Sequence, residues 1–190
     1  MGDDEALKLE IDRQEEYSRF MPLIKWLLIL PHLIVLAFLA IGALFVVIFA
    51  FFAVLITGRF PRGAFDFLVG VYRWSVRVNA YARLMVDPYP PFSLEDDPAY
   101  PARFELAYPE SVERWRPLVA WLLIIPYAIV AWVINIAAGF ATLFAFFTIL
   151  FTKRYPEGLF DIVLVSTRWN ARTIAYGHFA LTKYPEFSWK

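Results

Sequence analysis

The sequence predicts an all-α integral membrane protein built as a tandem repeat of two-helix units. Two observations carry this prediction. First, 60% of the 190 residues are hydrophobic and 19% are aromatic, whereas a soluble domain has about 45–50% apolar residues. Second, the segments 27–57 and 118–152 contain no Asp, Glu, Lys or Arg, and each exceeds the ~20 residues that cross a bilayer core.

The second half of the sequence repeats the first with a shift of 95 residues and no gap. PLIKWLLILP (22–31) aligns with PLVAWLLIIP (117–126), and TGRFPRGAFD (57–66) aligns with TKRYPEGLFD (152–161). Self-similarity at a fixed period indicates a repeated structural unit. We therefore place membrane repeat 1 at residues 1–95 and membrane repeat 2 at residues 96–190.

Each unit is predicted to begin with a strand and continue into a long apolar helix. The stretches LKLEID (7–12) and RFELAY (103–108) alternate with period two, which is typical of strands, and the two could pair at the membrane surface. In the apolar segment that follows, Pro31 and Pro126 recur. An interior proline removes a backbone hydrogen bond and kinks a helix, so we expect a short lead-in helix before the longer one.

The second helix of each unit is charged. It follows a turn that contains glycine and proline, is expected at about 62–86 and 157–181, and ends in a Pro- and Tyr-rich tail. At about 100° per residue, several of its charged side chains form one stripe, to which Arg83 does not belong. We predict the stripe to be a buried-charge or lipid-headgroup site: Asp66, Arg73 and Arg77, with Asp161, Arg168 and Arg172 in the second unit. If the stripe is buried, an aspartate or an anionic lipid must compensate the arginines.

Two placements of the charged helix are open. It could lie in the membrane interface with its stripe toward water, as amphipathic basic helices do. It could instead cross the bilayer, since ~25 residues at 1.5 Å each are long enough, and its arginines would then have to face protein. The two copies have similar flanking charges and should insert with one orientation, which needs an even number of crossings per unit. This argument favours about four transmembrane helices, with the stripe toward the bundle interior.

The landmarks of each unit resemble a known family. An apolar helix followed by GRFPRGAFDFLVGVYRWSVRVNAY (58–81) and DPYPPFSL (87–94) is similar to bacterial membrane proteins described as domain of unknown function 4389. The resemblance covers both units and implies a bacterial membrane location, but no activity and no catalytic residues. The second unit departs from the pattern, with KRYPEG in the turn and Val165 in place of Gly70.

The residue types argue against several functions. The net charge is zero and there is no cysteine, so the sequence favours neither nucleic-acid binding nor thiolate chemistry. It contains no metal-ligand cluster, nucleophile elbow or phosphate loop. His32 is expected to be a packed or interfacial histidine rather than a haem ligand, because its counterpart is Tyr127. We therefore expect no catalytic residue, cofactor or metal.

The favoured function is a non-enzymatic structural or accessory component, embedded in the membrane. It would pack against lipid, a partner membrane protein or further copies of itself. The alternative is a small transporter or channel that uses the Asp/Arg stripe, and a stripe that locks helices together is favoured over it. We expect a multi-pass protein of the bacterial inner membrane. The positive-inside rule places both termini in the cytoplasm and the turn at Gly58 outside.

Overall fold

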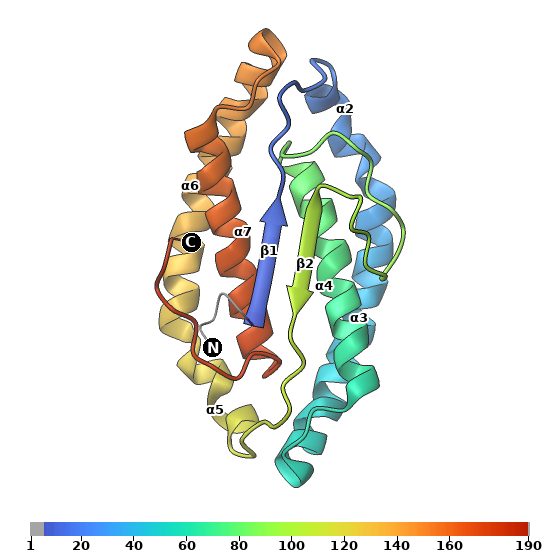
Figure 1. Cartoon of the computed structure of the whole chain (residues 1–190), viewed down its shortest axis with the longest axis vertical. Coiled ribbons are helices and arrows are strands. Elements are labelled where there is room, and N and C mark those ends of the chain that lie inside the picture. Colours follow the sequence, from blue (N-terminus) through green and yellow to red (C-terminus); the bar gives the residue numbers. More distant parts are fainter. Residues whose placement is uncertain (1–5, 190) are drawn as a thin grey trace.

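The computed structural model describes residues 6–189 and shows the same elements twice around a short sheet (Figure 1). The first half contains β1 (Leu7–Ile11), α2 (Met21–Leu28), α3 (Leu30–Thr57) and α4 (Arg62–Ala82). The second half contains β2 (Ala102–Leu106), α5 (Arg116–Leu123), α6 (Ile125–Thr152) and α7 (Glu157–Gly177). The prediction of a mostly helical, duplicated fold with short β segments is therefore confirmed.

The two strands pair antiparallel, and their register is symmetric. Leu7 lies opposite Leu106 and Ile11 lies opposite Ala102, so that the central pair is Leu9 with Phe104. Leu9 and Phe104 are equivalent positions of the two repeats. An antiparallel pair of equivalent residues places a pseudo-twofold axis through the centre of the sheet and perpendicular to it.

Each strand lies on the charged helix of the other repeat. In Figure 1, β2 lies beside α4 and β1 lies beside α7, whereas α3 and α6 form the outer pair and run in opposite directions. Side chains alternate along both strands, so one face of the sheet packs inward and the other is charged. The inward face contributes Leu7, Leu9, Ile11 and Phe104 to the core, and the outward face carries Lys8, Glu10, Arg103 and Glu105.

The ends of the helices follow local sequence signals. The predicted division of the apolar segment is confirmed, because α2 ends at Leu28 and α3 begins at Leu30. Pro31 then lies in the first turn of α3, where its missing N–H costs little. The charged helices end earlier than predicted, because Leu84 and its counterpart Phe179 have φ values of 64° and 50°, a conformation that no α-helix continues through.

The expectation of four transmembrane helices is not supported. Among the described residues, the stretches long and apolar enough to cross a membrane are Met21–Thr57 and Ile125–Thr152, and neither α4 nor α7 is one of them. The sheet gives the physical reason. It lies over the middle of α4 and α7 (Figure 1), so a bilayer crossed by these helices would place the charged outward face of the sheet in hydrocarbon, where charged side chains are costly.

The first tail, 87–97, folds back onto α4 and requires a glycine there. A Cβ atom at Gly70 would lie 2.8 Å from Leu94 Cβ and 3.0 Å from Leu94 O. The equivalent residues of the second repeat are Val165 and Trp189, and they line a cavity of about 400 Å³. Where the second repeat has Val165 in place of glycine, its tail thus packs less closely against the helix.

Alanine substitutions at two glycines of α4 should change stability in opposite directions. Gly70→Ala forces the tail to move, and overpacking of this kind costs about 1–3 kcal/mol. Gly63→Ala is the control, because a Cβ atom there meets nothing within 4 Å and alanine favours a helix by up to about 1 kcal/mol over glycine. Thermal unfolding in detergent measures both. Equal melting temperatures for the two variants would contradict the close contact between Gly70 and Leu94.

Candidate functional site

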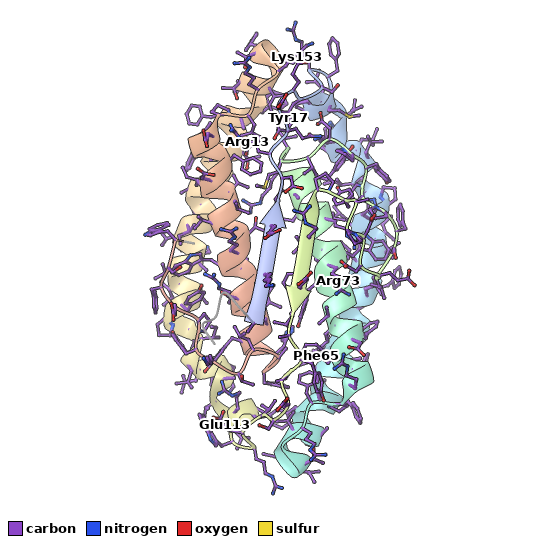
Figure 2. The ribbon with its side chains drawn as sticks, in the orientation of Figure 1. Arg13, Tyr17, Phe65, Arg73, Glu113 and Lys153 are labelled. Carbon is purple, nitrogen blue, oxygen red and sulfur yellow. The ribbon has the colours of Figure 1, made fainter. Side chains whose placement is uncertain are left out.

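Two arginines of the stripe bind strands that belong to the opposite repeat. Arg73 Nε donates to the Phe104 carbonyl at 3.1 Å, and Arg168 Nε donates to the Leu9 carbonyl at 3.0 Å. Figure 2 labels Arg73 on α4, beside β2. The four residues are equivalent in pairs, so the two contacts obey the pseudo-twofold axis.

The two accepted carbonyls point away from the neighbouring strand. Backbone hydrogen bonds join Asp12 N to Pro101 O and Ala107 N to Ala6 O. With the alternation of an antiparallel ladder, these bonds make Leu9 and Phe104 a non-hydrogen-bonded pair, whose carbonyls face outward. Each arginine therefore satisfies the central outward carbonyl of one open edge of the sheet.

Arg77 fastens the tail of its own repeat to α4. Its side chain is 2% exposed, and its guanidinium donates to the carbonyls of Ser93 and Glu95. Burial lowers the pKa of Arg77, and the carboxylates of Asp97 and Asp96 act against this shift. The equivalent Arg172 is also buried, at 3% exposure.

The arginines of the stripe contact different backbone segments, and the two aspartates lie on the surface of the protein. Asp66 is exposed and pairs with Arg62, its neighbour one turn away, at 3.2 Å, and Asp161 is exposed as well. The carboxylate near Arg73 is that of Asp96 in the tail, at 3.8 Å. Arg73 and Arg77 therefore face a strand and a tail, not the interior of a helix bundle, and backbone carbonyls take the place that we expected the aspartates to fill.

Each of the short apolar helices, α2 and α5, carries a buried cation. The sequence analysis did not identify either of them. Lys25 Nζ donates to the Val86 carbonyl at 2.7 Å and to Asp87 Oδ1 at 2.8 Å, and it lies 4.7 Å from the centre of the Tyr81 ring. In the second repeat the guanidinium of Arg116 lies 5.5 Å from the centre of the equivalent ring, Tyr176. A lone lysine in an otherwise apolar segment was the available signal.

Aromatic side chains bind the tails to the long helices in both repeats. Trp74 Nε1 donates to His32 Nδ1 at 3.0 Å, and the His32 ring stacks on Phe92 with ring centres 3.9 Å apart. The counterpart Tyr127 stacks on Trp169 at 4.3 Å. His32 is thus a packed histidine, as predicted. No group of three or more His, Cys, Asp or Glu side chains in the described part of the chain could hold a metal ion.

These contacts define a class of protein: a duplicated helical hairpin module with an apolar layer and a charged layer. The family follows from the sequence comparison. The chain matches domain of unknown function 4389 over residues 22–93 and again over 114–188, so it belongs to this family and contains two tandem copies of the domain. No curated protein and no solved structure matches it.

Arg77 should matter far more for stability than Asp66. Arg77→Met leaves two carbonyls without a charged donor, and each such hydrogen bond contributes about 1.5–3 kcal/mol. Asp66→Ala breaks an exposed pair, for which the change is about 0–1 kcal/mol. Melting curves in detergent measure both, with Arg62→Met as the control for the exposed pair. A loss at Asp66 as large as that at Arg77 would contradict the placement of the stripe.

The Lys25–Asp87 pair should show strong coupling. Asp87→Thr strands a buried ammonium group, which commonly costs about 3–5 kcal/mol, and Lys25→Ala leaves the Val86 carbonyl and Asp87 without their donor. Together the two changes reproduce Ala120 and Thr182, the equivalent residues of the second repeat. The double variant should therefore lose less stability than the sum of the single variants. Additive losses in denaturant unfolding would show that the two groups do not interact.

Proposed function

We propose that the protein is a non-enzymatic membrane component that lies along one face of the bilayer, with α3 and α6 in contact with lipid and the sheet in water. It acts as a structural or accessory element that packs against lipid and against neighbouring membrane proteins or further copies of the chain. The observation that carries this proposal is the separation of exposed apolar side chains from exposed charges.

The apolar layer is formed by α2, α3, α5 and α6. Their outward side chains include Phe38, Phe45 and Phe151, which are 71%, 67% and 72% exposed. No charged side chain interrupts α3 or α6. Soluble monomers rarely expose a continuous apolar patch larger than a few hundred Å², and a surface along two helices of 28 residues is more than that. Lipid is the occupant that suits an apolar surface of this length.

The pseudo-twofold axis supports a flat placement. Because the axis is perpendicular to the sheet, it turns one repeat into the other without exchanging the two faces of the molecule. Both repeats therefore present their long apolar helix to one side and their strand to the other. The common orientation that the flanking charges favour then needs no crossing by α4 or α7.

Tryptophan placement agrees with this orientation. Trp26 on α2 and Trp121 on α5 are 64% and 62% exposed, and their indole N–H groups already donate to Leu23 and Leu118 within their own helices. Their exposed rings are free to lie at the depth of the lipid headgroups, where tryptophan is enriched.

The contacts of the stripe support a structural role over a transport path. Arg73 and Arg77 donate to strand and tail carbonyls, and Asp66 lies apart from them. A pathway needs polar groups that line a continuous space, whereas these are used within the fold. The family resemblance supports the inner membrane of a bacterium, and we place the sheet side, which includes β1, on the cytoplasmic face.

Labelling of single cysteines tests the orientation, and the chain has no natural cysteine to remove. Cysteines at Lys8, Arg59 and Arg154 sample the sheet and the two turns, and all three side chains are exposed. Gly58 is avoided because its φ of 71° suits glycine. We expect an impermeant maleimide to label all three positions from the cytoplasmic side, in inverted vesicles but not in intact cells.

Other placements give different patterns. Four crossings would label Arg59 and Arg154 from outside and Lys8 from inside. Two crossings by the antiparallel α3 and α6 would label the two turns from opposite sides. Phe45→Cys, on the exposed face of α3, is the matched control and should react only after the membrane is dissolved. Either of the other patterns would overturn the flat placement.

A further inference from the structure

A cavity of about 410 Å³ lies between the two repeats, among α3, α4 and α7. Phe104, whose side chain points inward from the sheet, closes one end. Leu44 and Ile174, which are 58% and 46% exposed, also line the cavity. Its mouth therefore opens on the apolar side of the molecule. The volume falls in the range of about 300–1,000 Å³ that is typical of small-molecule sites.

The lining is apolar with a few uncharged polar groups. Small apolar side chains of α3 form one wall, and the side chains of Asn79 and Asn170 lie on α4 and α7. Asn79 Oδ1 is buried and accepts no hydrogen bond from the described part of the chain, and an amide side chain can both donate to and accept from a ligand. His178 is hydrogen-bonded to the Tyr72 hydroxyl, and burial lowers its pKa, which keeps it neutral at pH 7.

Polar side chains meet at the equivalent position in the other half of the molecule. There Arg83 takes the place of His178, and its guanidinium donates to Asn135 Oδ1. The Ser166 hydroxyl donates to the same oxygen at 3.2 Å. Asn135 and Ser166 are the counterparts of Ala40 and Val71, which line the cavity. Three polar side chains thus meet at this position in one half, whereas the other half has Ala40, Val71 and His178 there and contains the cavity.

We infer that this cavity binds one uncharged amphiphile, with its apolar chain along α3 and its hydroxyl or ester group at Asn79 and Asn170. The inference rests on the proposed placement of the apolar side in lipid, because the mouth opens there. An ionised headgroup is disfavoured, because no charged side chain lines the cavity to compensate it.

The test uses the full chain in detergent, with monoolein as the probe and native mass spectrometry as the readout. The parent protein should bind one monoolein. The triple variant Ala40→Asn, Val71→Ser and His178→Arg copies the sealing residues and should bind it at least tenfold more weakly. The reciprocal variant Arg83→His, Asn135→Ala and Ser166→Val opens the equivalent space and should bind two. Oleate at pH 9 has the same chain with an ionised group and should bind at least tenfold more weakly than monoolein.

Equal monoolein binding by the parent and the sealed variant would overturn the inference, and so would equal binding of oleate and monoolein. If the sealed variant does not unfold cooperatively, Ser75→Phe gives the same test, because it adds volume at an exposed position that lines the cavity. Flotation of the parent and the variant with liposomes separates this inference from the proposed function. Protein that floats but binds no monoolein would overturn the cavity ligand alone, whereas protein that does not float would overturn the membrane placement.

Discussion

The open edges of a two-stranded sheet are the constraint on which the rest of the fold depends. A pair of strands is only marginally stable by itself, and its outward carbonyls must find donors. Here an arginine in the middle of a helix supplies the donor for the central carbonyl of each edge, Arg73 for β2 and Arg168 for β1. Because the arginine belongs to one repeat and the carbonyl to the other, neither repeat can complete its own strand, and duplication is part of the fold rather than an addition to it.

The same constraint explains why charged residues stand in an otherwise apolar helix. Arg73 and Arg77 are one turn apart and would repel each other if both faced the same empty space. Each instead binds a different backbone segment, the strand for Arg73 and the tail for Arg77. Guanidinium suits this task, because its planar array of donors can bind two carbonyls at once and it stays charged when buried. The arginines thus hold irregular backbone against a regular helix.

Local features of this fold could be predicted from the sequence, and the contacts between elements could not. The division before Pro31 and the two strands follow from patterns within short segments, and the repeat follows from aligning the sequence with itself. A helical wheel places Asp66 and Arg73 on one face, but it does not show that a strand and a tail cover the part of that face around Arg73. An even number of crossings is not required by two copies that are related by a twofold axis perpendicular to the sheet, because this axis leaves the same face of each copy on the same side of the molecule. Residues 7–11 and 102–106 are equivalent in the two repeats. Antiparallel pairing of these equivalent strands, centred on Leu9 and Phe104, produces this twofold symmetry.

Some differences between the repeats are compensated by a second change nearby, and others are not. The buried cation moves by one helical turn, from Lys25 to Arg116, and still lies over the equivalent tyrosine ring. The cation thus occupies different positions in the two repeats, but its contact with the tyrosine ring is the same. The difference between Arg83 and His178 is not compensated in this way. The side chains around His178 leave a cavity next to it. Close packing favours filling such a space, and this cavity is therefore the place where we propose that a ligand, rather than a side chain, completes the packing.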